Sequence, residues 1–364
     1  MAESKRERPV AWVWDWVDGE WKQDSQRGDL SPGRIVLVDA AFGGYGPNGW
    51  DPESRPAIPV SAGTSTLQDK ADDAQEREDL SESRWKTIAT HGAEVGSLAQ
   101  KLATTIGLGE GLSGLLRIAG EHHDHGKAIR FFQGSIRHAD RPDRQDLAKA
   151  PNPWPGGRKV LYRENAGEGS EHRPGLRHEL ASMLALFGLL KDYRSDHPAL
   201  LGGWEGYLEG AINPDEREAR GAWTLRILSL QDRASFDLVA YLVLSHHGKV
   251  RMRLSATPQD QAYRAQDNGG LPINGVREGD ELPALYGNGG ELMAPVLRLT
   301  LEPAYLGLSD MTGPSWTERA QGLLAAYGPG ALAFLEALLR TADIRASRYT
   351  TADPLLNEQC EVGK

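Results

Sequence analysis

The sequence predicts a mostly α-helical fold preceded by a small β-rich segment, and two patterns support this prediction. Near the N-terminus, apolar and polar residues alternate in VAWVWDWV, residues 10–17, which is the two-residue period of a strand. From Trp85 onward, apolar residues recur at three- and four-residue spacing, as in WKTIATHGAEVGSLAQKLATTIGL. That spacing is typical of amphipathic helices.

Residues 1–65 are predicted to form the β-rich segment. Three tryptophans lie on one face of its first strand: Trp12, Trp14 and Trp16. Asp18-Gly19 is a typical hairpin turn before EWK, and RIVLVDA (34–40) is a further strand that leads into the Gly-rich turn GGYGPNGW. We interpret the tryptophan row as the core of a small sheet rather than as a platform on which bases stack.

The acidic, polar segment 66–83 is predicted to be a linker. Residues 84–364 then form the larger domain. Five of its segments have helical periodicity: residues 85–108, 111–132, 175–193, 236–248 and 330–347. Two irregular inserts interrupt them, near residues 139–173 and 255–315, and APVLRLTLE in the second insert is predicted to be a short strand pair.

Composition limits the class of protein. Of the 364 residues, 25% are charged and 39% hydrophobic, as in ordinary soluble domains. The net charge of −10 argues against a general nucleic-acid coat. It does not exclude a nuclease, because bound metal makes an imidazole- and carboxylate-rich site positive.

The protein is expected to be cytoplasmic, without a membrane partner. The single cysteine, Cys360, excludes an intrachain disulfide and suits a reducing compartment. MAESKRERPV lacks the apolar core of a signal peptide. The longest apolar run, Ala181 to Leu190, is too short to span a bilayer. No GxxxxGK[ST] motif occurs, so the chain is not expected to carry an ATP-driven motor.

The histidines indicate a metal site. Six lie in or beside apolar helical patterns: His91, His122, His123, His178, His246 and His247. One such histidine is usually a hydrogen-bonded core or surface residue. Here four predicted helices each carry a histidine, one as His-Asp and one as His-His, and the last helix carries Asp343. Packed helices can bring such ligands together around two divalent metals about 3.5–4 Å apart.

The order His91, His123-Asp124, Asp343 resembles the H…HD…D pattern of the HD phosphohydrolase superfamily. HHDHGKAIRFFQ further resembles the HDxGKxxxxFQ block of the HD nuclease of type I CRISPR systems. RHE (177–179), SHHGKVR (245–251) and LLRTADIRAS (338–347) are similar to that family's later blocks, in the same order. SPGRIVLVDAAFGGYGPNGW is similar to the part before the HD domain in subtype I-U. The resemblance covers roughly residues 84–350.

The resemblance implies a ligand set for two divalent metal ions, which would be manganese, nickel, cobalt, iron or magnesium. The first metal would be held by His91, His123, Asp124 and Asp343. The second would be held by His178, His246 and His247, with Asp124 bridging the two. His122 and His125 fall outside this pattern and are interpreted as packing residues or as supports for the ligands. Three further histidines, His138, His172 and His197, lie in polar surroundings and are expected to be solvated.

Basic residues beside these motifs have predicted roles in substrate binding. Lys127 follows Asp124 by three residues, so on a helix it would share that face and contact a scissile phosphate. The alternative is a surface lysine. Lys249, Arg251 and Arg253 are predicted to hold a DNA backbone, and the alternative is an ordinary basic loop. Gln133 and Ser347 match family positions and are given supporting roles only.

The function that the resemblance implies is a metal-dependent nuclease that cuts single-stranded DNA in CRISPR interference, with Asp124 and Lys127 as catalytic residues. The metals would lower the pKa of the attacking water and stabilise the departing oxygen. A CRISPR helicase component and the guide-RNA surveillance complex would be its partners. Two alternatives stay open: an HD phosphohydrolase acting on nucleotides or cyclic nucleotides, and a non-catalytic HD scaffold, which predicts missing ligands.

Overall fold

The structure of the protein is a computed structural model. The chain divides into two compact units, Met1–Asp72 and Asp73–Lys364, which are described separately. The structure describes residues 11–15, 20–23, 36–39, 45–46, 49–50, 53, 84–136, 139–151, 162–163, 172–173, 175–201, 221–248, 251–256, 260, 272–309 and 311–348. The predicted linker, residues 66–83, lies outside these ranges.

The first unit contains the predicted small sheet. Strands β1 (Ala11–Asp15), β2 (Glu20–Gln23) and β3 (Val36–Val38) form an antiparallel sheet in the order β2-β1-β3, so the hairpin and the third strand are confirmed. A second small hairpin joins β4 (Tyr45–Gly46) to β5 (Gly49–Trp50) within the predicted Gly-rich turn.

The prediction for the tryptophan row is tested only in part. Among the described side chains of β1, Val13 is buried, at 6% exposure, and Trp12 is half-buried. Side chains alternate between the faces of a strand, so Trp12 and Val13 lie on opposite faces. Trp21, opposite β1 in the hairpin, is 43% exposed. The side chain of Trp14 and all of Trp16 lie outside the described part of the chain.

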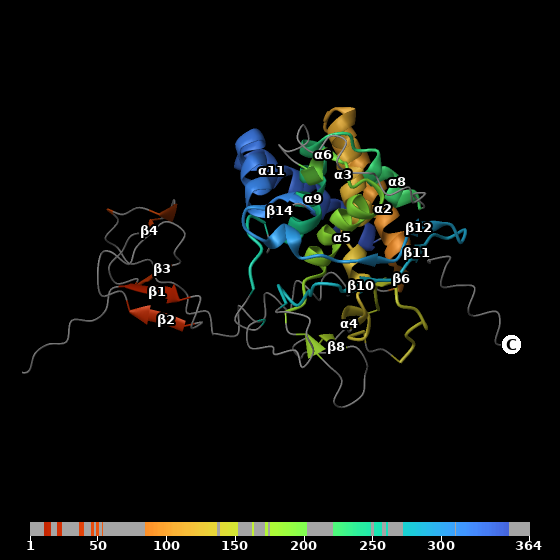
Figure 1. The fold of residues 1–364 in the computed structure, drawn as a ribbon, viewed down its shortest axis with the longest axis horizontal. Coiled ribbons are helices and arrows are strands. Elements are labelled where there is room, and N and C mark those ends of the chain that lie inside the picture. The colour runs from red at the N-terminus through yellow and green to blue at the C-terminus, as the bar shows by residue number, and fades with distance from the viewer. Residues whose placement is uncertain are drawn as a thin grey trace, which may run out of the picture. The chain divides into compact units, whose positions relative to one another are not determined.

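The second unit is mostly helical, as predicted, and each of the five predicted segments contains a helix (Figure 1). The long helices are α2 (Ile88–Thr105), α3 (Glu110–His122), α5 (His178–Tyr193), α9 (Arg233–Ser245) and α11 (Trp316–Arg348). The shorter ones are the 3-10 helices η3 (His125–Ala128) and η5 (Glu302–Ala304) and the α-helices α4 (Arg130–Gln133), α6 (Pro198–Leu201) and α8 (Ala222–Leu228).

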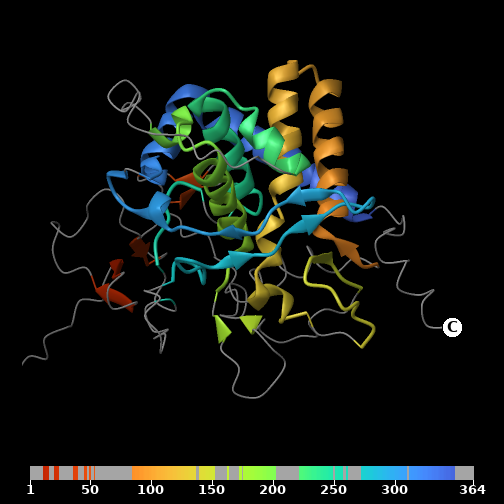
Figure 2. The same cartoon turned by 45° about the vertical axis from the view of Figure 1, so that its right-hand side comes forward.

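Glycines let α2 and α3 pack closely side by side (Figure 2). A Cβ added at Gly120 would lie 2.8 Å from Cα of Gly96, and one added at Gly92 would lie 2.5 Å from the carbonyl oxygen of Glu121. Both distances are shorter than any ordinary contact, so larger residues would separate the two helices. The side chain of Thr87 caps α2 by accepting a hydrogen bond from the Thr90 N–H.

Helix α5 is the centre of the core, since it is buried continuously from His178 to Leu190. It packs against α9 and against η3. The Gly126 N–H donates to Ser182 Oγ at 2.7 Å, and a Cβ at Gly126 would lie 2.1 Å from the His178 carbonyl oxygen. This close approach places the turn after α3 directly against the first turn of α5.

Helix α11 is interrupted by a kink. Gly328 has a φ of 74° and is followed by Pro329, which removes a backbone donor and prevents a continuous helix. Among the described helices, α11 is the one that is long and apolar enough to cross a membrane, judged by length and composition alone. In this fold it packs against α2 and α9.

The two inserts form short strand pairs. In the first, β7 (Leu147–Lys149) pairs with β6 (Lys86–Thr87), which lies outside the insert and directly before α2, and β8 (Tyr162–Arg163) pairs with β9 (His172–Arg173). In the second, the pairs are β10 (Glu281–Leu282) with β13 (Leu297–Arg298), β11 (Leu285–Tyr286) with β12 (Leu292–Ala294), and β14 (Leu308–Ser309) with β15 (Gly313–Pro314).

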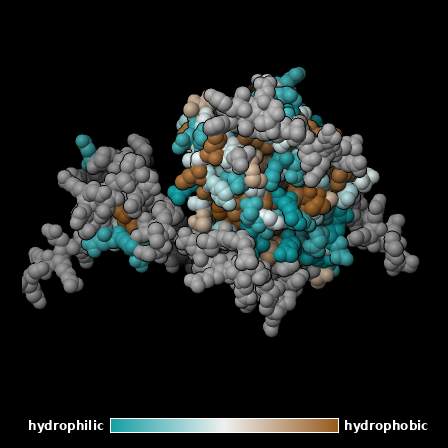
Figure 3. All heavy atoms as spheres, in the orientation of Figure 1, coloured by the Kyte–Doolittle hydropathy of each residue, from teal (hydrophilic) through white to brown (hydrophobic). Residues whose placement is uncertain are grey.

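The prediction that two strands within APVLRLTLE pair with each other is therefore wrong. Strand β13 of that segment pairs with β10, and β12 pairs with β11, so each strand finds its partner outside the segment. On the face of this unit seen in Figure 3, hydrophilic and hydrophobic side chains are interspersed.

Candidate metal centre

All seven predicted metal ligands lie at or near the ends of helices that meet in the core. His91 is in the first turn of α2, and Asp343 is in the last turns of α11. His123 follows the last residue of α3, and Asp124 lies between α3 and η3. His178 begins α5, and His246 and His247 follow the end of α9. The HD pair and the His-His pair are thus in turns, not in helix interiors as the sequence suggested.

Backbone contacts orient two of these rings. Nδ1 of His123 lies 2.8 Å from the Gly120 carbonyl oxygen, and Nδ1 of His246 lies 2.6 Å from the Val243 carbonyl oxygen. A carbonyl oxygen only accepts, so Nδ1 carries the proton in both rings and Nε2 is left with its lone pair. A metal ligand needs that lone pair.

The ligands form two buried clusters, each of which could hold a metal ion. We call His91, His123 and Asp124 the first cluster, and His178, His246 and His247 the second cluster. In each, one ligand atom from every residue lies within 4.8 Å of the others. Asp343 adjoins the first cluster, because its Oδ1 lies 2.8 Å from His91 Nε2 and 3.7 Å from His123 Nε2.

Asp124 lies between the clusters. Its Oδ2 is 3.4 Å from His123 Nε2 and 3.8 Å from His91 Nε2. Its Oδ1 is 3.3 Å from His178 Nε2 and 4.0 Å from His246 Nε2. One oxygen of the carboxylate therefore faces each cluster.

The donor set fits a divalent cation. Four of these atoms are buried and have no hydrogen-bond partner: His123 Nε2, His178 Nε2, His246 Nε2 and Asp124 Oδ1. Buried polar atoms in native proteins are almost always paired with protein, water or an ion. Imidazole nitrogen and carboxylate oxygen are ligands of borderline and hard divalent metals, so metal binding would satisfy these atoms together.

Electrostatics favour the metal-binding protonation states of four ligands: His91, His178, His246 and Asp124. Burial, together with the charge of Lys149, lowers the pKa of His91 to about 3, and burial lowers the pKa of His178 and of His246. Burial alone would raise the pKa of Asp124, but its neighbours His123 and Lys127 hold it well below its usual range. Neutral imidazoles and ionised carboxylates are the forms that bind metals.

Lys127 is not a surface lysine. It is 1% exposed, and its Nζ donates to Asp124 Oδ2 at 2.9 Å. Its backbone carbonyl accepts a hydrogen bond from Gln133 Nε2 at 2.7 Å, which gives Gln133 a structural role. Ser347 Oγ lies 3.3 Å from Asp343 Oδ1 and supports that carboxylate.

Two residues beside the centre were missed by the sequence analysis. Lys149, in β7, is 1% exposed, and its Nζ lies 3.3 Å from Asp343 Oδ1. Glu179 is 2% exposed, and its Oε2 lies 3.6 Å from His178 Nδ1. Glu179 belongs to the RHE block, so the sequence motif could have identified it. No motif marks Lys149, which lies in the first irregular insert.

The remaining histidines fall under two predictions: His122 and His125 as packing residues, and His138, His172 and His197 as solvated residues. His122 and His125 are fully buried, with ring centroids 5.2 and 6.3 Å from that of Trp223, as expected of packing residues. The prediction that His197 is solvated is wrong: it is 0% exposed, and its ring bonds the Leu230 carbonyl oxygen and the Ala199 N–H. His138 and the side chain of His172 lie outside the described part of the chain.

The predicted DNA-binding residues follow the second cluster. Lys249 lies outside the described residues, and Arg253 is exposed. Arg251 is half-exposed and its Nη2 pairs with Glu336 Oε2 at 2.7 Å, so part of its role is structural. Glu336 is buried and also accepts a hydrogen bond from the Tyr241 hydroxyl at 2.5 Å.

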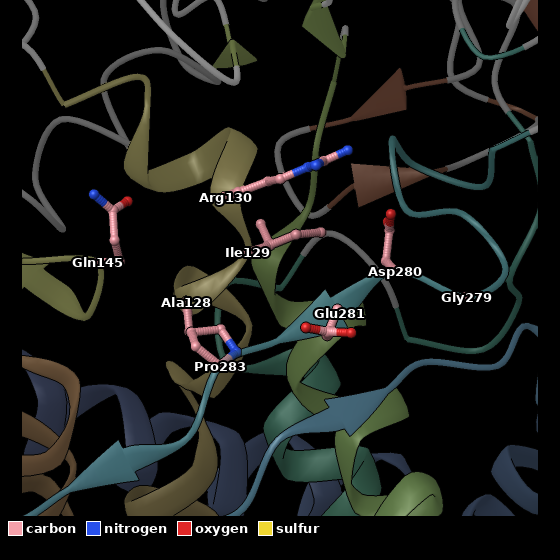
Figure 4. A pocket seen from close by; sticks show the side chains of 8 residues that line it. All are labelled: Ala128, Ile129, Arg130, Gln145, Gly279, Asp280, Glu281 and Pro283. Atoms are coloured by element: carbon pink, nitrogen blue, oxygen red, sulfur yellow. The ribbon is translucent and has the colours of Figure 1, made fainter. Parts of the chain in front are cut away.

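A separate cavity of about 410 Å³ lies beside η3 and β10 (Figure 4). It is lined by residues of both charges, including Arg130, Asp280 and Glu281. None of the seven ligands lines it, although Ala128 in its wall directly follows Lys127.

Comparison of the chain with models of known families, with curated proteins and with solved structures gave no match.

Proposed function

We propose that this chain is a metal-dependent DNA nuclease with an HD-type helical bundle. The observation that carries the proposal is the position of Asp124, with one carboxylate oxygen toward each of two buried clusters. A single-metal site does not need a carboxylate in that position, whereas a two-metal site needs a bridging ligand between neighbouring ions.

Two divalent ions would be held by the seven ligands, with Asp124 shared. Bound there, they would supply the Lewis acidity that lowers the pKa of an attacking water and stabilises a departing oxygen. The chain's own residues orient this centre: the carbonyls of Gly120 and Val243 fix two rings, and Lys127 holds Asp124. We also propose that Lys127 meets a phosphate oxygen that approaches Asp124 and stabilises charge on the scissile phosphate; its contact with Asp124 Oδ2 supports this role.

The sequence blocks support the choice of substrate and partners. HHDHGKAIRFFQ and the three later blocks occur in the order of the HD nuclease of type I CRISPR systems. The leading segment favours subtype I-U. We therefore propose single-stranded DNA as the substrate, interference against foreign DNA as the process, and a helicase component and the guide-RNA surveillance complex as partners in the cytoplasm.

A second candidate is an HD phosphohydrolase that acts on nucleotides or cyclic nucleotides. The depth of the centre favours it, since the most exposed ligands, His178 and His247, are only 6% exposed. A small substrate enters such a site more easily than a strand of DNA does. The basic residues Arg251 and Arg253, immediately beyond the second cluster, favour a DNA strand as the substrate instead.

The experiment that separates these functions is a turnover assay on circular single-stranded DNA and on a panel of nucleotides and cyclic nucleotides, with manganese present. Nuclease activity that is lost in Asp124→Asn supports the proposal. Turnover of nucleotides alone favours the second candidate. A wild-type chain that binds no metal and turns over neither substrate would make it a non-catalytic scaffold.

A further inference from the structure

The irregular insert that follows α4 contributes a charged residue to the metal centre. Strand β7 of this insert pairs with β6, immediately before α2, and Lys149 lies opposite Lys86 in the register. Both lysines are buried, at 1% and 2% exposure. Burial of a charge without a partner is costly, so the direction in which each ammonium points is informative.

The two ammonium groups have different partners. Lys86 Nζ donates to Glu94 Oε2 at 2.6 Å and to the Ala346 carbonyl at 2.9 Å, outside the seven ligands. Lys149 Nζ lies 3.3 Å from Asp343 Oδ1. That oxygen is the one that contacts His91 Nε2, so Lys149 bonds the carboxylate oxygen that faces the first cluster.

The backbone of β7 is held in place from both sides. Gln133 Oε1 accepts a hydrogen bond from the Leu147 N–H at 3.2 Å, and Gln133 Nε2 donates one to the Leu147 carbonyl oxygen at 2.9 Å. The Ile88 N–H donates to the Asp146 carbonyl at 2.7 Å. Lys149 is thus presented from a fixed strand rather than from a free loop, which a positioning role requires.

The lysines also match the carboxylates of the centre one to one. Lys127 contacts Asp124 Oδ2 and Lys149 contacts Asp343 Oδ1. Asp343 Oδ1 also meets His91 Nε2 and Ser347 Oγ. A carboxylate oxygen has more than one lone-pair direction, so a metal held by His91 and Asp343 would replace the contact between them while the Lys149 contact remains. Groups that bond a metal-binding carboxylate in this way fix its orientation.

We propose that Lys149 is a positioning residue that holds Asp343 Oδ1 toward the first cluster, and thereby sets the metal affinity of that cluster but not of the second. The proposal rests on the metal centre described above and assigns Lys149 no contact with substrate. It gives the first insert a defined part in building the site.

The test is a calorimetric titration of the metal-free full chain with Co²⁺. Lys149→Met is expected to weaken one binding step by about 10–100-fold, the usual loss when such a supporting group is removed. The step belonging to the first cluster is identified as the one that Asp343→Asn also weakens. The other step should stay within about threefold of wild type, and Lys149→Arg, which keeps the charge and donors, should recover most of the loss.

Lys86→Met is the matched control, because it removes an equally buried lysine from the paired strand without touching Asp343. It should leave both steps unchanged. Equal affinity of Lys149→Met and wild type, or an equal loss in Lys86→Met, would overturn the proposal. If Lys149→Met does not fold, Lys149→Gln provides the neutral variant, and an unchanged first step in it would have the same meaning. A wild-type chain without Co²⁺ affinity would instead contradict the metal centre itself.

Discussion

His178 Nε2 lies 3.3 Å from Asp124 Oδ1, although the two residues come from different helix ends and the other oxygen of Asp124 faces His123. Buried on all sides, these atoms lack the hydrogen bonds that such groups normally have. The contact joins the second cluster to the first through a single carboxylate. Loss of Asp124 should therefore affect both clusters, whereas loss of a ligand that belongs to one cluster should affect that cluster alone.

Asp124→Ala is expected to abolish cleavage and to weaken metal binding at both clusters. It should also lower the free energy of unfolding of the metal-free protein by about 3–5 kcal/mol, because it leaves the buried Lys127 without its partner. Denaturant titration measures this loss. The double variant Asp124→Ala with Lys127→Met should recover part of the stability and no activity. Near-normal cleavage by Asp124→Ala in manganese would contradict the assignment.

The sequence predicted the composition of this centre better than its local structure. The sequence blocks around His91, His123, His178 and His246 predicted metal ligands that the fold brings together. The periodicity did not show that α3 ends at His122 and α9 at Ser245, because apolar spacing continues past the residue where the backbone turns. Lys149 was not foreseen, since its position depends on pairing between β6 and β7, which are far apart in the chain.

The error at His197 has the same origin. Its sequence neighbours are polar, but its environment is set by residues distant in sequence: Leu230 bonds the ring, and Phe236 lies 6.1 Å away, centroid to centroid. In β1, Val13 is buried and Trp12 on the opposite face is half-buried, a difference that alternation alone does not predict. Local patterns determine elements, whereas tertiary contacts determine burial.

The double variant His246→Ala with His247→Ala should lower the bound-metal count from two toward one. Both residues belong to the second cluster with His178, and neither contributes to the first. Cleavage of single-stranded DNA should fall by orders of magnitude, with stability reduced only by the lost metal linkage. Ser245→Ala, at the same helix end, is the control. A double variant that binds two metals and cuts normally would make these histidines structural.

Activity should require an added divalent ion, with manganese, cobalt or nickel giving faster turnover than magnesium. The clusters offer imidazoles from five histidines beside the carboxylates of Asp124 and Asp343, and magnesium prefers all-oxygen surroundings. Turnover after exhaustive chelation and re-addition of each metal measures the order. Full activity in the chelated protein would contradict a metal mechanism.

Arg251 and Arg253 should respond differently to substitution. Arg253→Ala removes an exposed charge, so it should weaken binding of single-stranded DNA and reduce the slope of log K against log salt by about 0.7, with unchanged stability. Arg251→Ala also removes the pair with Glu336, and should lower the free energy of unfolding by up to about 1 kcal/mol because the arginine is half-exposed. Equal effects of both variants on stability would contradict this division.

His197→Gln should make the protein less stable at pH 7.5 and should matter less at pH 5.5. Nε2 of His197 meets the Leu230 carbonyl and Nδ1 accepts the Ala199 N–H, so the ring is neutral in the fold. Burial lowers its pKa. As the pH falls below about 6.5, the unfolded chain takes up a proton on this residue that the folded protein does not, and wild-type stability falls. The variant lacks this proton uptake.

At pH 7.5, where the effect is absent, the hydrogen bonds lost in His197→Gln should lower the free energy of unfolding by about 1–3 kcal/mol. Denaturant titrations of both proteins at the two pH values give the difference, and a gap that stays constant or widens at pH 5.5 would show that His197 is charged in the fold.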